Sequence, residues 1–392
     1  MTSNANIIGV NMVKFEKPGK NEAYEIMASK AITNALKDAG ITLSEVNQVY
    51  ASYVYGDSTS GQTALYKVGM TGVPIINVNN NCSSGSTALY LARQAVESGA
   101  AECVLAFGFE QMKPGALGDN WSDRTSPFQW IYDEFDRLNP ELPDGPVALK
   151  VFGAAALEYL EKYNPNPDIF GKVAVKSRQH AVNNPYSLFT KEITLDEVMK
   201  SPEIYPGLKR LMACPPTCGA AAVVVCSDKF AKKHQIKNAV KIVAQSMTTD
   251  QPDTKDTNIN LIGQKMTERA AKEVYEKSGI GPEDVDVIEL HDCFTPNEVI
   301  TYEGLGLCGE GESEKFINDQ ENTYGGKFVI NPSGGLMSKG HPLGATGLAQ
   351  CTELVWHLRG EAGNRQVEGA KVALQHNLGL GGACLVTMYQ KA

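Results

Sequence analysis

Cys82 stands in the polar stretch Asn79 to Thr87, between the apolar run Ile75 to Val78 and a helical pattern from Ala88 to Ser98. A buried strand that leads through a polar turn into a helix places this thiol at the first helical turn, where free backbone N–H groups and the helix dipole favour an anion. A nucleophilic cysteine needs such a place or a neighbouring base, because a free thiol is only slightly ionised at neutral pH. A structural cysteine under a helix cap explains this stretch equally well.

Two histidines stand in settings that suit chemistry. His341 lies between a glycine and a proline ahead of a helical pattern, so a stiff turn holds its imidazole where it can meet another group. His291 and Cys293 follow the apolar run Val287 to Leu290, and residues just beyond the carboxyl end of a strand often form active sites in α/β sheets. Asp292, between them, is expected to face solvent or to serve structure.

A glycine-rich segment closes the sequence. Gly379, Gly381 and Gly382 follow the strand-like run Val372 to Gln375, and glycines leave backbone N–H groups uncovered by side chains. Such groups could line an oxyanion site. The alternative is an ordinary turn between two buried strands.

The composition narrows the function classes. The 392 residues carry a formal net charge of −9, which argues against a nucleic-acid or anionic-membrane surface. No apolar run approaches the roughly 18 residues of a membrane helix, and no signal peptide is visible. Nine cysteines without regular spacing favour a reducing, intracellular compartment over a disulfide framework. Cys214 and Cys218 form the nearest approach to a metal motif, but no second ligand cluster accompanies them, so no metal is expected.

Strand-type and helix-type patterns alternate along most of the chain, which predicts an α/β protein. Helical patterns are predicted over 21–39, 148–163, 168–182 and within 256–278, and strand patterns over 46–54, 103–107 and 219–226. Twelve of the nineteen prolines fall between positions 114 and 216. Because prolines interrupt regular structure, we interpret this region as an insertion packed over the sheet domain.

The second half of the chain repeats features of the first. Gly40-Ile41, an acidic turn and a valine-rich strand reappear 239 positions later at Gly279-Ile280. The turn at Cys82 and its helix reappear 259 positions later at His341 and its helix. Two similar halves are therefore predicted, and if they pack about a pseudo-twofold axis, the amino termini of the two equivalent helices converge. Chance similarity of α/β segments is the alternative.

Together these segments resemble the thiolases, most closely the sterol carrier protein-type thiolases. Cys82-Ser83-Ser84 is similar to their nucleophile motif, His291-Asp292-Cys293-Phe294 to the loop of that subfamily, and Gly340-His341-Pro342 to the shared histidine motif. The resemblance implies an α/β thiolase fold, with duplicated βαβαβαββ halves in five αβαβα layers and an inserted loop domain. It places the halves at 1–231 and 232–392, with the insertion at about 112–212.

The resemblance also implies roles. Cys82 is expected to attack the 3-oxo carbonyl of a 3-oxoacyl-CoA, with His341 as its base and Cys293 as the second acid and base. One oxyanion site is expected from His341 and, through a water, His291, and the other from the backbone N–H groups of Cys82 and Gly379. Where other thiolases carry a second catalytic cysteine, this chain has Asn377.

CoA is expected as a co-substrate, with no resident cofactor and no metal. Its phosphates require a basic patch, which we predict from one helical stretch and a glycine-rich loop: Lys172, Lys176, Arg178, His180 and Ser333. Solvated helix charge explains each basic residue equally well. A homodimer or homotetramer in the peroxisome, or in the cytoplasm of a prokaryote, follows from the family, with no nucleic-acid partner and no membrane span. Alternatives are a biosynthetic acetoacetyl-CoA thiolase and a non-catalytic scaffold.

Overall fold

The computed structural model describes residues 4–115, 118 and 121–391. Its first half contributes five strands to the main sheet: β1 (Ala5–Met12), β2 (Gln48–Ser52), β3 (Ile75–Val78), β4 (Cys103–Glu110) and β7 (Gly219–Ser227). The second half contributes five more: β8 (Val240–Thr248), β9 (Val287–Glu289), β10 (Val329–Ile330), β11 (Val372–Gly379) and β12 (Ala383–Lys391). Their spatial order is β10-β9-β11-β12-β8-β1-β7-β4-β2-β3.

The two halves have the same strand order. If the strands of each half are numbered one to five along the chain, their order from the outer edge of the sheet inwards is three-two-four-five-one in both halves. The halves join where β1 lies antiparallel to β8, through the pairs Asn6↔Lys241 and Ile7↔Val240. The duplication predicted from the two offsets is therefore confirmed in the topology.

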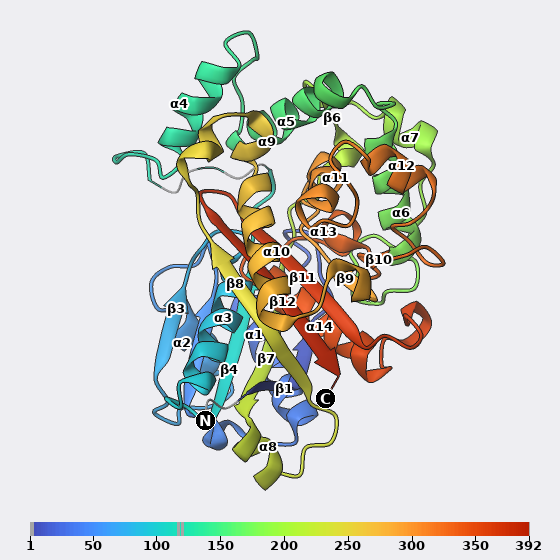
Figure 1. The fold of residues 1–392 in the computed structure, drawn as a ribbon. Coiled ribbons are helices and arrows are strands. Elements are labelled where there is room, and N and C mark those ends of the chain that lie inside the picture. The colour runs from blue at the N-terminus through green and yellow to red at the C-terminus, as the bar shows by residue number, and fades with distance from the viewer. Residues whose placement is uncertain (1–3, 116–117, 119–120, 392) are drawn as a thin grey trace.

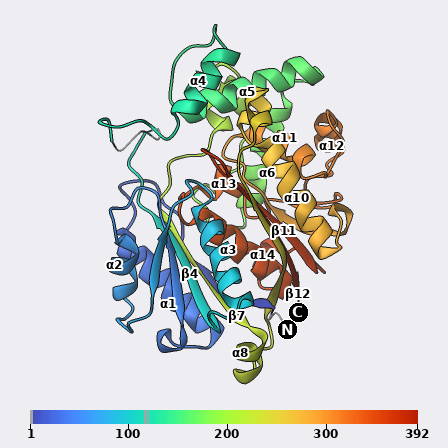
Figure 2. The ribbon, with the colours of Figure 1, turned by 60° about the vertical axis from the view of Figure 1, so that its left-hand side comes forward.

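Helices complete five layers. In the first half, α1 (Tyr24–Ala39) and α2 (Ser60–Tyr66) cover the outer face, and in the second half α10 (Gln264–Ser278) does the same. Between the two five-stranded halves of the sheet, α3 (Ser84–Glu97) packs against α14 (Thr346–Arg359), as Figure 2 shows. The predicted α/β fold class with a five-layer arrangement is confirmed. The division at 231 and the bounds of the insertion stay predictions.

The segment between β4 and β7 forms most of the separate cap in Figure 1. It contains α4 (Gln129–Leu138), α5 (Val147–Tyr163), α6 (Ile169–Ala181), α7 (Leu195–Lys200) and the short strands β5 (Glu203–Tyr205) and β6 (Leu208–Lys209). α5 and α6 pack on α11 (Thr295–Gly304), the helix that follows Cys293. This packing buries one face of α6, including residues predicted to bind CoA.

The remaining helices are short: α8 (Asp228–Lys233), α9 (Asn258–Leu261), α12 (Ser313–Asn318) and α13 (Gly335–Ser338). In the part of the chain that the structure describes, none of the helices has both the length and the apolar character needed to cross a bilayer.

Candidate active site

Cys82 lies two residues before α3, in the turn that leaves β3. Asn81 adopts a left-handed backbone conformation, φ 51°, which turns the chain sharply ahead of the cysteine. The Ser84 hydroxyl accepts a hydrogen bond from the Asn80 N–H at 2.9 Å and donates one to the Asn81 carbonyl at 2.6 Å, so the turn is pinned from inside the helix. The thiol is only 8% exposed.

Burial raises the pKa of the Cys82 thiol to about 12. Backbone N–H groups of Leu380 and Cys82 itself act in the opposite direction, but they do not outweigh the cost of desolvating a thiolate. The expectation that the helix terminus stabilises a resting thiolate is therefore wrong. Cys82 rests as a neutral thiol and needs a base.

His341 provides a base close to the thiol, from the turn before α14. Its Nδ1 lies 2.7 Å from Thr346 Oγ1, and that hydroxyl donates its single proton to the Pro342 carbonyl at 3.0 Å. Nδ1 must therefore carry the ring proton and donate it to Thr346. The other nitrogen, Nε2, keeps its lone pair and is buried without a hydrogen-bond partner among the residues that the structure describes. Burial lowers the pKa of His341 to about 3, so the ring is neutral.

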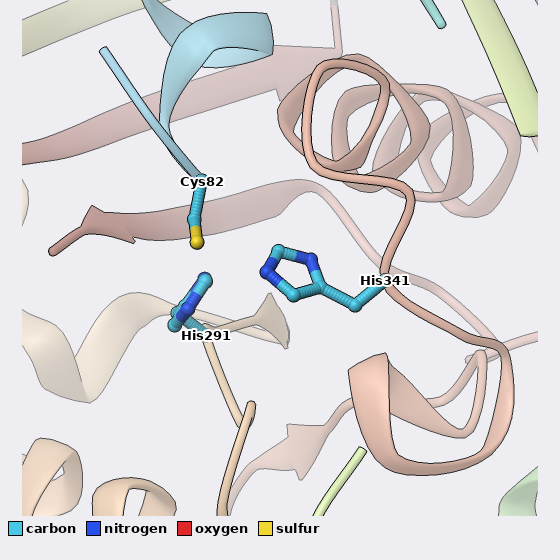
Figure 3. Close-up of side chains that lie close together, drawn as sticks. All are labelled: Cys82, His291 and His341. Carbon is cyan, nitrogen blue, oxygen red and sulfur yellow. The ribbon is translucent and has the colours of Figure 1, made fainter. Parts of the chain in front are cut away.

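His291 reaches the same place from the loop after β9. Its ring meets that of His341 edge to face, with centroids 5.0 Å apart. Figure 3 shows both rings beside the Cys82 sulfur. Cys82, His291 and His341 each offer one sulfur or nitrogen atom to a cluster in which these atoms lie within 4.8 Å of one another. The structure thus brings together three of the four predicted catalytic side chains.

Cys293 lies outside this cluster of three but borders it. Its thiol is 6% exposed, and burial, together with the neighbouring Cys214 and Cys82 thiols, raises its pKa well above the ordinary value. The Cys214 N–H donates to the Cys293 carbonyl at 2.9 Å. The Cys214-to-Cys218 segment therefore supports the Cys293 loop. Asp292 is fully buried and accepts the Leu336 N–H at 2.7 Å, so it serves structure rather than facing solvent.

The glycine-rich turn after β11 packs directly on the Cys82 loop. A Cβ on Gly379 would lie 2.3 Å from the Asn80 carbonyl oxygen and 2.5 Å from Ser83 Oγ, so only glycine fits. The Asn81 side-chain amide donates to the Leu380 carbonyl at 2.9 Å and fixes the turn. Gly379 is therefore in place for the predicted oxyanion role, which stays a prediction. The Leu380 N–H, one residue further on, was not anticipated.

Glu110 was also missed from the sequence, although it lies only three residues beyond the predicted strand 103–107. It ends β4, is 1% exposed, and accepts the backbone N–H groups of Val54, Tyr55 and Gly344, each at 3.0 Å. Burial raises its pKa to about 7 against the lowering effect of these three bonds. This carboxyl group ties the turn after His341 to the end of β2.

The predicted CoA-binding residues separate into two groups. Lys176 is 6% exposed and ion-paired with the buried Glu298, and both ring nitrogens of His180 are bonded, to the Asn331 carbonyl at 3.0 Å and to Thr323 at 2.8 Å. Ser333 is fully buried and donates to Glu289 at 2.8 Å. We therefore withdraw these three as phosphate ligands, because they hold α6 and the glycine-rich loop inside the protein.

Lys172 and Arg178 remain accessible on α6. Lys172 is one-third exposed and pairs with Asp168 at 3.1 Å, and the Arg178 guanidinium lies 3.9 Å from the centroid of the Phe189 ring. Desolvation lowers the pKa of Arg178. Their contact with CoA stays a prediction.

Comparison with known proteins agrees with this architecture. Residues 5–229 match the family model "Thiolase, N-terminal domain" and residues 249–388 match "Thiolase C-terminal domain-like". This chain belongs to the thiolase family. Thiolases are acyltransferases, so the chain is an enzyme of that class, and the resemblance drawn from its motifs is confirmed.

Individual relatives cover almost the whole chain. It is 54% identical to sterol carrier protein 2 of Homo sapiens, across 98% of this chain and 71% of that protein. It is 36% identical to benzoylsuccinyl-CoA thiolase subunit BbsB of Thauera aromatica, across 96% and 94%. Among solved structures, the Ltp2-ChsH2(DUF35) aldolase superposes with a TM-score of 0.83 at 24% identity, covering 100% of this chain and 98% of that one, which shows a shared fold.

Proposed function

We propose that this protein cleaves 3-oxoacyl-CoA thioesters with CoA, yielding a shortened acyl-CoA and acetyl-CoA or propionyl-CoA. The observation that carries the proposal is the cluster of Cys82, His291 and His341, in which a thiol lies beside an imidazole lone pair. The name of the BbsB relative, a CoA thiolase subunit, supports a CoA thioester as substrate. CoA acts as co-substrate, and the pathway is fatty-acid or branched-chain and sterol side-chain β-oxidation.

The first half-reaction transfers the acyl group to sulfur. The Cys82 thiol gives its proton to His341 Nε2 while the sulfur bonds to the 3-oxo carbon. The bond between the second and third carbons then breaks, and its electron pair moves into the enolate of acetyl-CoA or propionyl-CoA. The Cys293 thiol protonates the carbon of that enolate, which leaves an acyl-Cys82 thioester and a Cys293 thiolate.

Two sets of hydrogen-bond donors stabilise the negative charge that develops on the substrate oxygens. After accepting the thiol proton, His341 Nε2 has become an N–H donor, and together with His291 it can hold the enolate oxygen of the leaving thioester. The backbone N–H groups of Cys82 and Gly379 serve the oxygen of the group on Cys82. Loss of one such donor typically costs about 10²- to 10³-fold in rate.

The second half-reaction restores the enzyme. The Cys293 thiolate removes the proton of the CoA thiol, and the CoA sulfur attacks the acyl-Cys82 thioester. The bond between the acyl carbon and Cys82 breaks, and the Cys82 sulfur takes back its proton from His341. By microscopic reversibility the reverse reaction follows the same steps, so the same residues would serve Claisen condensation in the biosynthetic direction.

A thiolysis assay tests the proposal, with acetoacetyl-CoA and with long and 2-methyl-branched 3-oxoacyl-CoA as substrates. Cys82→Ala should lower kcat by more than about 10³-fold, as should Cys293→Ala, because each removes a group that makes or breaks bonds. Cys308→Ala is the control and should keep full activity. Cys308 lies just before α12, where its thiol shares a hydrogen bond with the Ser313 hydroxyl. Turnover retained in Cys82→Ala would show that Cys82 is not the nucleophile. If the parent protein shows no turnover in either direction, the alternative of a non-catalytic scaffold is favoured.

The proposal extends to location and assembly. The resemblance to sterol carrier protein-type thiolases supports residence in the peroxisome, and imaging of a fluorescently tagged chain in a eukaryotic cell tests it. A homodimer or homotetramer is supported by an uncovered sheet edge at β3, where Ile76 is 39% exposed.

A further inference from the structure

Asn377 touches both sides of the candidate site, although the proposed reaction gives it no role. It is fully buried on β11, and its side-chain amide nitrogen lies 3.1 Å from His291 Nδ1 and 3.3 Å from the Cys82 carbonyl oxygen. A carbonyl oxygen only accepts hydrogen bonds, so the atom that faces it must be the NH₂ group. The orientation of the amide is thereby settled by chemistry, and both of its hydrogens are in use.

The other end of the amide agrees with this orientation. Asn377 Oδ1 lies 2.7 Å from Ser86 Oγ, which must be the donor because an amide oxygen only accepts. Ser86 in turn accepts from Gln375 Nε2 at 2.9 Å, and the Gln375 oxygen accepts the hydroxyl of Tyr389. Tyr389, Gln375, Ser86, Asn377 and His291 therefore form one chain of hydrogen bonds that all run in the same direction.

The direction of this chain fixes the proton on His291. Because Asn377 donates to Nδ1, that nitrogen must hold a lone pair, and the ring proton of the neutral imidazole resides on Nε2. Burial, with His341 and His376 nearby, lowers the pKa of His291 well below its ordinary value, so a second proton does not bind. His291 thus has an N–H at Nε2, whereas His341 has a lone pair at Nε2.

We propose that Asn377 is a positioning residue that locks His291 in the Nε2–H form, so that one histidine donates to the substrate oxygen while the other accepts the thiol proton. The functional part rests on the proposed thiolase reaction, but the tautomer does not. A carboxylate at position 377 accepts rather than donates, and it would draw the ring proton to Nδ1. His291 would then turn a lone pair toward the substrate oxygen.

The tautomer can be measured without turnover. With ¹⁵N-labelled histidine the chain gives signals from six rings, and His291→Gln identifies that of His291. The parent protein should show His291 protonated at Nε2, and Asn377→Asp should show it protonated at Nδ1. Cys82→Ala, which abolishes the proposed reaction, should keep the parental tautomer. An Nδ1–H ring in the parent, or an unchanged Nε2–H ring in Asn377→Asp, would overturn the proposal.

Kinetics supply the second readout. Asn377→Asp should lower kcat about 10²- to 10³-fold, the typical cost of one oxyanion donor, and leave KM within about threefold. Asn260→Asp is the matched control: its amide is also buried and donates to a carbonyl, that of Asp253 at 2.9 Å, in α9. If Asn377→Asp fails to fold, Asn377→Ala takes its place and should show both tautomers of His291. A KM increase with unchanged kcat would contradict the assigned role.

Discussion

His291 and His341 lie with their rings in contact and carry their ring protons on opposite nitrogens. The difference comes from their partners: Thr346 accepts from His341 Nδ1, and Asn377 donates to His291 Nδ1. Two identical side chains thereby become a base and a donor. If the Cys82 sulfur and one nitrogen of each ring all offered lone pairs, the cluster would resemble a zinc site. Because His291 carries its proton on Nε2, that nitrogen offers an N–H instead of a lone pair.

The neutral state of Cys82 and His341 predicts a flat pH profile for acylation. The pKa of His341 is lowered to about 3 and that of Cys82 is raised to about 12, so neither group changes its resting charge between pH 5.5 and 8.5. Glu110 titrates near pH 7, and its charge raises the pKa of Cys82, so any residual trend is a shallow decline with rising pH. Single-turnover release of acetyl-CoA from acetoacetyl-CoA, without free CoA, measures this step.

His341→Ala provides the contrast for the pH profile. Without the base, only thiolate already present reacts, so the rate of acylation should fall by at least about 10²-fold and then rise about tenfold per pH unit. A tenfold rise per pH unit in the parent protein would show that free thiolate, and not the Cys82–His341 pair, is the nucleophile.

Thr346→Val tests how the base is held. This change removes the acceptor for His341 Nδ1–H and leaves the ring free to place its proton on Nε2, so kcat should fall about tenfold, with KM little changed. Thr352→Val is a close match, because Thr352 is also buried in α14 and its hydroxyl also bonds a carbonyl four residues earlier, that of Leu348 at 2.8 Å. Equal activity of the two variants would show that Thr346 does not orient the ring.

The sequence predicted which residues form the site better than it predicted their ionisation and burial. Cys82 and His341 stand out in the sequence because stiff turns and the repeat mark their positions. The state of the Cys82 thiol could not be predicted, because it depends on how much water the opposite half excludes. Lys176 and His180 were misjudged for the same reason: a helical pattern shows that they share α6, but only α11 and the Asn331 loop decide that their side of the helix is buried.

At the scale of elements, glycines set how closely the two helix-bearing turns approach. A Cβ on Gly85, in α3, would lie 3.0 Å from the Gly344 carbonyl oxygen and from the Gly347 nitrogen. The amino-terminal turns of α3 and α14 therefore meet backbone to backbone. This contact is what brings Cys82 and His341 from distant parts of the sequence into one cluster.

Gly108 on β4 approaches the turn after His341 more closely still than Gly85 does, and Gly108→Ala should disturb both stability and activity. The added Cβ would lie 2.1 Å from the Gly344 carbonyl oxygen, so the turn after His341 must move. We expect the free energy of unfolding to fall by about 3 kcal/mol, as in overpacked cores, and kcat to fall at least tenfold because His341 is displaced. Urea unfolding and the thiolysis assay measure the two effects.

Gly69→Ala is the control, because its Cβ would meet only a Leu43 methyl group at 3.4 Å. It should leave stability within about 0.5 kcal/mol and activity unchanged. If Gly108→Ala behaves like Gly69→Ala, the close approach of β4 to the His341 turn has no bearing on the site.

Viewed as a whole molecule, the site exists only because two copies of one unit face each other. The first half supplies Cys82, and the second supplies His291, Cys293, His341 and Asn377. That the two halves share one strand order was implicit in the repeat, since equivalent sequences fold alike. The contact between Ser86 and Asn377 could not be predicted from the repeat. This hydrogen bond between the halves depends on the register of α3 against β11, which no local sequence pattern encodes.

The outer edge of the first half predicts association between copies of the chain. Among the described residues, β3 pairs with β2 alone and forms the end of the sheet, and Ile76 on it is 39% exposed. A hollow of about 650 Å³ lies nearby, lined by residues of β2, α3 and the turn that follows α3: Gln48, Tyr50, Leu91, Gln94, Ala95, Glu97, Ser98 and Ala100. An apolar, unpaired edge next to a hollow favours pairing with another strand.

Ile76→Lys should therefore weaken self-association, because a charge on this edge would have to be buried between copies. Sedimentation equilibrium at micromolar concentration should give a multiple of the single-chain mass for the parent and a larger share of single chains for Ile76→Lys. Val182→Lys replaces a residue of similar exposure, 41%, at the end of α6 and should sediment like the parent. Because β3 leads directly into the Cys82 turn, loss of association should also lower the rate of thiolysis. If Ile76→Lys keeps the mass of the parent assembly, the contact between copies lies on another face.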